Sequence, residues 1–185
     1  MSIADIAKSV IKSINDGDTL ATVTLPASNF HEGTVKLATV LLGKKLGGIY
    51  ITTSRPSSHI TAELEEAKAN LSDLYFVDLV SMTVGGNTDD ARTLFIESPT
   101  MLESILLNIT LLERRLKSKR IFVIFDSING LSIYSTPMVL KEFINVLGNS
   151  MRIKSIYTML MTVEEQTDDD LAAALELLSD TMIGT

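Results

Sequence analysis

An apolar run that ends in a carboxylate and a hydroxyl is the first feature of this sequence that could do chemistry. Residues 121–127 read Ile-Phe-Val-Ile-Phe-Asp-Ser, and an aspartate at the end of a buried strand can hold Mg²⁺ beside a bound phosphate. The matching phosphate-binding loop would read G-x-x-x-x-G-K-[ST]. Residues 28–35 instead read S-N-F-H-E-G-T-V, in which only Gly33 fits. The sequence thus has the metal-holding carboxylate without the loop that would hold the phosphate.

Other polar residues are expected near Asp126, because ligands of open parallel sheets bind beyond the carboxyl ends of the strands. One interpretation is a pocket for an anion or a small polar effector, with Arg55 as its charge partner. The alternative, which we favour, is that Arg55 pairs with Asp126 or Glu32 in a collapsed pocket, because charged side chains are rarely buried without partners. Asp126 would then cap the next turn through Ser127 and Asn129. The expected mouth comprises Phe30, His31, Glu32, Gly33, Thr53, Ser54, Arg55, Asp126, Ser127 and Asn129.

The elements that must position these residues follow from apolar periodicity and from turn residues. Strands are predicted over 19–25, 48–53, 74–80, 93–96, 120–126, 155–163 and 180–183. Helices are predicted over 2–16, between Ser2 and Gly17, and over 35–46, 57–71, from Ser98-Pro99 to Leu116, from Thr136-Pro137 to near Gly148, and after a Thr167 cap. Between them, Gly85-Gly86-Asn87 lies in a long loop over 81–97. Such alternation predicts an α/β fold of three layers, α/β/α, with a mainly parallel central sheet.

Composition limits the classes of function. A chain of 185 residues, 45% of them hydrophobic, is expected to form a single domain over 1–185, with the amphipathic helix of 1–17 packed on it. No apolar run reaches the roughly 18 residues of a membrane span, so we expect a cytoplasmic protein without membrane contact. The chain has no cysteine and only two histidines, which predicts no metal site. A net charge of −7 makes nucleic acid an unfavourable partner. The basic cluster is better explained as helix termination; it comprises Arg114, Arg115, Lys117, Lys119 and Arg120.

Four segments, in order, resemble the KaiC-like branch of the RecA superfamily of phosphate-loop ATPases, found in many archaeal proteins. They are G-I-Y-I-T-T-S-R-P from Gly48, S-P-T-M-L-E from Ser98, I-F-D-S-I-N-G-L-S-I-Y from Ile124, and L-L-S-D-T-M-I ending at Ile183. The likeness runs from about Thr19 to the C-terminus. It implies a RecA-like sheet, a nucleotide site at its carboxyl edge and assembly through surfaces beside that site.

The departures from this family decide the functional interpretation. Thr34 stands where the family has its phosphate-binding lysine, and Val35 where it has the hydroxyl that ligates magnesium. Ser54-Arg55 replaces the acidic residues that orient the attacking water, so only Asp126 matches. If each lost contact costs about 3 kcal/mol, little catalysis remains.

We therefore expect a pseudo-ATPase with no catalytic residue, no metal and no cofactor, which acts as a signalling or regulatory module through protein partners and possible homo-oligomers. A vestigial nucleotide site would comprise Gly33, Thr34, Arg55, Asp126 and Ser127. The alternative is a sensor that binds ATP or ADP with magnesium without efficient hydrolysis. An enzyme that uses His31, Glu32 and Asp126 for other chemistry is least supported, because no triad spacing is visible.

Overall fold

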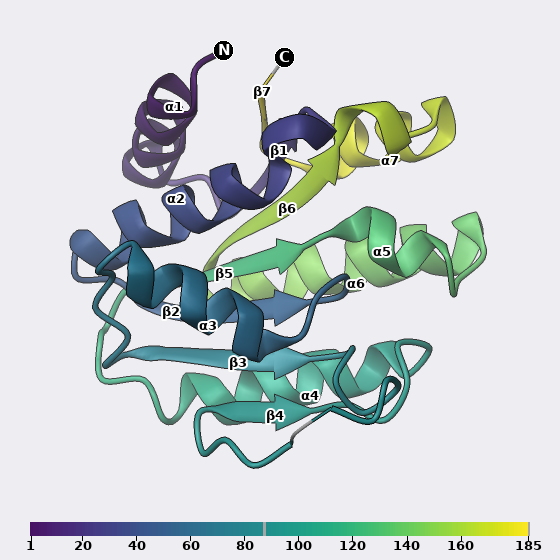
Figure 1. Cartoon of the computed structure of the whole chain (residues 1–185). Coiled ribbons are helices and arrows are strands. Elements are labelled where there is room, and N and C mark those ends of the chain that lie inside the picture. The colour runs from purple at the N-terminus through teal and green to yellow at the C-terminus, as the bar shows by residue number, and fades with distance from the viewer. Residues whose placement is uncertain (87, 185) are drawn as a thin grey trace.

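Seven strands in the described part of the chain form one parallel sheet between two layers of helices, in a computed structural model that describes residues 1–86 and 88–184 (Figure 1). Their order is β4-β3-β2-β5-β6-β1-β7, and each neighbouring pair is parallel. The strands are β1 (Leu20–Leu25), β2 (Gly47–Thr52), β3 (Leu74–Asp78), β4 (Thr93–Phe95), β5 (Ile121–Asp126), β6 (Tyr157–Val163) and β7 (Thr181–Gly184). The helices are α1 (Ile3–Asp16), α2 (Phe30–Gly43), α3 (Ser57–Glu66), α4 (Leu102–Glu113), α5 (Ile128–Ser132), α6 (Pro137–Lys154) and α7 (Asp169–Leu178).

The two helical layers cover opposite faces of the sheet, as predicted for a three-layer α/β/α fold. Helices α1, α2 and α3 share one apolar cluster with Phe122 and Ile124 of β5. Helices α4, α5, α6 and α7 share the other cluster with Val123 and Phe125. Alternate residues of β5 thus face opposite layers, and all four of these side chains are fully buried. Among the described residues, no helix combines the length and apolar character that a membrane crossing requires.

The first helix is formed as predicted. Ser2 is its N-cap and accepts the Asp5 amide, while Gly17 ends it in the left-handed conformation at φ 93°. Ile6 and Val10 are buried in the cluster that also contains α2. The amphipathic face of α1 is therefore part of the core.

Predicted boundaries of α2, α3 and α4 are wrong. Helix α3 ends at Glu66 rather than Leu71, because Lys68 adopts a left-handed conformation with φ 57°. Helix α4 begins at Leu102 rather than at Ser98-Pro99, where the hydroxyls of Ser98 and Thr100 bond each other in a turn. Helix α2 begins at Phe30 rather than Val35. In the predicted loop over 81–97, Asn87 lies outside the described residues, whereas β4 is present within that segment.

The C-terminal half contains two further corrections and a helix that the sequence did not predict, α5. Helix α6 passes Gly148 and ends at Lys154, with Ser155 left-handed, so β6 begins at Tyr157. Gly148 is a packing residue, because a β-carbon there would lie 2.8 Å from Leu20 Cδ2. Helix α7 is capped by Asp168, which accepts the Leu171 amide, whereas the Thr167 hydroxyl donates to Val163.

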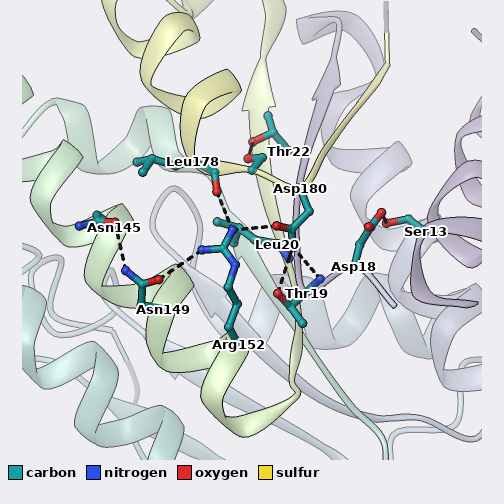
Figure 2. A network of polar contacts seen from close by, with 11 residues as sticks. Ser13, Asp18, Thr19, Leu20, Thr22, Asn145, Asn149, Arg152, Leu178 and Asp180 are labelled. Carbon is teal, nitrogen blue, oxygen red and sulfur yellow. Dashed lines mark hydrogen bonds and ion pairs between the residues drawn. The ribbon is translucent and has the colours of Figure 1, made fainter. Parts of the chain in front are cut away.

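A polar network joins the beginning and the end of the sheet. Asp180 accepts the backbone amides of Thr19 and Leu20, both at 2.9 Å, just before and at the start of β1. Figure 2 shows the same carboxylate bonded to the guanidinium of Arg152, at 2.8 Å, and Arg152 also donates to the carbonyl of Leu178. Hydrogen bonds from these groups outweigh burial and lower the pKa of Asp180 to about 2.

Candidate functional site

The connection from β1 to α2 occupies the place where a phosphate loop was considered. It consists of Pro26 and one 3₁₀ turn (Ala27–Asn29), and α2 begins at Phe30. The sequence predicted a start at Val35, five residues later, and that prediction is wrong. Phe30 is buried in the core, and a Glu32–Lys36 ion pair supports the exposed side of the first turns. A turn of helix thus stands where a phosphate-binding loop would have to be open.

Gly33 and Thr34 therefore lie inside α2. Thr34 is fully buried, and its hydroxyl donates to the carbonyl of Phe30 at 2.8 Å. A β-carbon on Gly33 would lie 2.7 Å from Leu25 Cδ1. The glycine permits close packing of α2 against β1, and both residues face the protein interior.

A backbone amide of the β1–α2 connection already binds an anionic group of the protein. The Glu165 carboxylate, in the 3₁₀ turn after β6 (Glu164–Gln166), accepts the amide of Ala27 at 2.8 Å. Amides before a helix attract anions such as phosphate. Here an internal carboxylate takes that position, and no sequence pattern indicated this contact.

Asp126 lies at the end of β5, fully buried, and is paired with a tyrosine of the adjacent strand. Tyr50 of β2 donates its hydroxyl to Asp126 Oδ2 at 2.6 Å. Burial raises the pKa of the Asp126 carboxyl above its usual value, although the Tyr50 bond and the charge of Arg55 act in the opposite sense. Oδ1 has no hydrogen bond among the described residues. The sequence had suggested that Asp126 caps the next turn, and that prediction is wrong, because its side chain bonds only Tyr50 among the described residues.

Arg55 pairs with Glu63 of α3, with 2.6 Å between Nη1 and Oε1. The expected pairing with Asp126 or Glu32 is wrong, since Glu32 pairs with Lys36. Arg55 remains near enough to Asp126 to lower the pKa of that carboxyl. Its Nε and Nη2 are buried without a hydrogen bond in the described part of the chain.

Three further residues of the expected mouth, Thr53, Ser127 and Asn129, hold parts of the fold together, whereas His31 and Ser54 are exposed. The Thr53 hydroxyl donates to the Ser127 carbonyl and accepts the Ser127 amide, both at 2.7 Å, across a cis peptide bond between Asp126 and Ser127. Ser127 is the N-cap of α5. Asn129 accepts the Val163 amide at 2.9 Å and donates to the carbonyl of Gln166 at 3.0 Å. These three residues are buried, and their hydrogen bonds connect β2, β5, α5 and β6 to one another.

A cavity of about 360 Å³ opens between α2 and α3, and of the ten residues expected at the mouth only Glu32 lines it. Its charged lining has three carboxylates and one amine, which disfavours a phosphate. It is lined by Glu32, Val35, Lys36, Glu63, Glu66 and Ala67. The structure thus brings Thr53, Asp126 and Ser127 together but seals them by mutual hydrogen bonds.

Two buried polar residues were missed from the sequence. Tyr50 sits in an apolar run, and a buried tyrosine hydroxyl needs a partner, which was a usable signal. Asp78, at the end of β3, accepts the amides of Ser57, Val80 and Ser81, so its pKa is below the usual value although burial raises it. It fixes the start of α3. No cluster of three or more potential metal ligands occurs among the described residues.

Comparison with known proteins identifies the fold. The sequence matches no family model and no curated protein. Among solved structures, a KaiC-like protein from the hyperthermophilic archaeon Pyrococcus horikoshii OT3 is similar, with a TM-score of 0.64 over 90% of this chain and 69% of that one. The two sequences are 11% identical, so the likeness concerns the fold. The chain has a KaiC-like, RecA-type fold, as its sequence resemblance predicted.

Proposed function

We propose that this chain is a noncatalytic RecA-type domain that acts as a signalling or regulatory module through contacts with protein. One observation carries the proposal: α2 begins at Phe30, so that a turn of helix replaces the loop that would surround a phosphate. Phosphoryl transfer depends on positioning and charge stabilisation, which are the functions that such a loop supplies.

The charged groups near this helix support the same conclusion. Lys36 is directed along the surface of α2 to Glu32. The Ala27 amide is bonded to Glu165, and the Asp126 carboxylate to Tyr50. A nucleotide with magnesium would have to break these internal contacts before it gained any of its own. We infer that neither ATP nor ADP binds at physiological concentrations.

A role in protein contacts is supported by apolar side chains on the surface of the described residues. Ile153 of α6 is 87% exposed, Met138 is 77% exposed, and Leu107 of α4 is 61% exposed. Leu107 and Ile153 belong to the two helices that flank an apolar groove, and apolar surfaces of this kind commonly mark interaction sites.

Thermal unfolding with and without 5 mM ATP and magnesium, repeated with ADP, tests this proposal. A ligand at about 100 times its dissociation constant would stabilise the native state by about 2.7 kcal/mol, a shift of several degrees. We expect no shift and no release of phosphate, in the wild type or in Asp126→Asn. A shift that Asp126→Asn abolishes would instead establish a nucleotide sensor, and phosphate release sensitive to that variant would establish an ATPase.

A further inference from the structure

Helices α4 and α6 lie on the same face of the sheet and are separated by an apolar groove. The groove encloses about 230 Å³ and has two carboxylates at its rim. Its apolar lining comprises Leu102, Leu106, Val139, Phe143 and Val146, and its acidic rim comprises Glu103 and Glu142. The two helices that flank the groove also carry exposed apolar side chains, since Leu107 of α4 and Ile153 of α6 are 61% and 87% exposed. We define the α4/α6 face as this groove together with five further residues, Leu107, Leu111, Arg114, Arg115 and Ile153.

Helical spacing aligns the exposed residues in two stripes. Glu103, Leu107 and Arg114 follow one another at intervals of four and seven residues, which places them on one side of α4 and its C-cap. Glu142, Val146 and Ile153 follow the same intervals on α6. Both helices connect parallel strands and so run in the same direction, opposite to the strands.

The charges of this face are segregated along the helices. Glu103 and Glu142 lie near the starts of α4 and α6, whereas Arg114 and Arg115 lie just after the last residue of α4. All four are exposed, and within the described part of the chain none forms an ion pair or a side-chain hydrogen bond. Eleven residues of helix separate Glu103 from Arg114 by about 16 Å. The face is therefore negative at one end, apolar in the middle and positive at the other end.

We propose that the α4/α6 face binds a second copy of this chain in an antiparallel dimer with twofold symmetry. A twofold axis through the middle of the face sets Glu103 of one protomer against Arg114 or Arg115 of the other, and the reverse contact follows by symmetry. Leu107 then packs against Leu107 and Leu111 on α4 of the opposite protomer, beside the apolar groove. Nucleic acid is a less suitable partner, because its phosphates would be repelled by the carboxylates of this face. A parallel dimer is disfavoured as well, because it would bring like charges of the two protomers together.

The size of the face indicates a weak dimer. Helices of 12 and 18 residues, each about 10 Å wide, present on the order of 500 Å² per protomer. Stable complexes bury about 800 Å² per partner, and smaller contacts are transient. We therefore expect a dissociation constant in the micromolar range. The dimer rests on the proposed function and supplies its partner.

Sedimentation velocity between 5 and 500 µM tests the dimer, and Leu107→Glu is the first variant. We expect wild type to pass from monomer to dimer and Leu107→Glu to raise the dissociation constant at least about tenfold, since a carboxylate would enter an apolar contact between two helices. Val40→Glu is the control, because Val40 is 37% exposed on α2, in the helical layer that covers the opposite face of the sheet. Loss of association in Val40→Glu with none in Leu107→Glu would place the contact elsewhere and overturn the proposal.

Charge reversal tests the antiparallel orientation. Glu103→Arg and Arg114→Glu should each weaken the dimer about tenfold, and the double variant should recover most of the affinity, because each protomer carries both changes. Added salt should weaken the wild-type dimer. A monomer at every concentration, or a double variant weaker than either single one, would refute the dimer. Nucleotide binding is measured separately, by thermal unfolding. A protein that stays monomeric and does not bind ATP would refute the dimer without contradicting the proposal of a noncatalytic domain.

Discussion

Replacing Asp180 with asparagine tests whether the network in Figure 2 fastens the end of the sheet to its beginning. The carboxylate accepts two backbone amides of the β1 start and the guanidinium of Arg152. Asparagine has the shape of the protonated acid, so it keeps one acceptor oxygen and loses the charge. The variant therefore measures what ionisation of Asp180 contributes to stability.

The magnitude follows from the pKa of Asp180, which falls from 3.8 to about 2 on folding. At 1.36 kcal/mol for each unit, this shift corresponds to about 2.4 kcal/mol. The side chains of Asp180 and Arg152 are 28% and 35% exposed, so solvent screening reduces the expected loss to about 1–2 kcal/mol. Because the native pKa lies below the unfolded one, this stability is complete above about pH 4 and is lost as pH falls towards 2.

Urea unfolding of both proteins from pH 7 to pH 2.5 provides the assay. We expect Asp180→Asn to be less stable by about 1–2 kcal/mol at pH 7, and the difference to shrink between pH 4 and pH 2.5. Asp16→Asn is the matched control, since Asp16 is exposed and its side chain forms no hydrogen bond or ion pair among the described residues. A difference below about 0.5 kcal/mol at pH 7, or one that does not change with pH, would refute the reasoning.

Three further changes probe the buried site. Asp126→Asn should raise the urea midpoint at pH 8 more than at pH 4.5, because the raised pKa of this carboxyl means that folding disfavours its charged form; an unchanged midpoint would contradict this. Tyr50→Phe removes the donor to Asp126 and should cost about 1–3 kcal/mol in urea unfolding, and less in an Asp126→Asn background. Gly130→Ala would place a β-carbon 2.2 Å from Thr53 Oγ1 and should cost about 1–3 kcal/mol, whereas Gly43→Ala, with open space around it, should be neutral or stabilising.

The sheet could be predicted from sequence because its strands are short apolar runs between turn residues. Residues 121–126 illustrate this, since both faces of β5 are covered and every residue of its interior is apolar. The RecA-type fold followed from four ordered segments. Helix ends were less predictable, because Gly148 resembles a stop signal and only its packing against Leu20 explains a glycine inside α6.

The sequence could predict which residues lie together at the site, but it could not predict which of them form hydrogen bonds and ion pairs with one another. Asp126, Thr53 and Ser127 do lie together, as expected from strand ends that meet at one edge of a sheet. Arg55 had several acidic residues within reach, and the choice of Glu63 depends on how α3 crosses the sheet. The start of α2 was misjudged because comparison with a glycine-rich loop outweighed Phe30, whose burial requires the helix to begin earlier.

The position of β1 has a consequence for how the chain folds during synthesis. Its two neighbours in the sheet are β6 and β7, and Thr19 bonds Asp180, 161 residues further along the chain. The first strand made therefore has no strand to pair with until nearly the whole chain has left the ribosome. Such distant contacts slow folding and leave apolar segments exposed in the meantime. We infer that the half formed by β2, β3, β4 and β5 assembles first, that β1 joins the sheet once β6 is in place, and that the edge strand β7 then adds to β1.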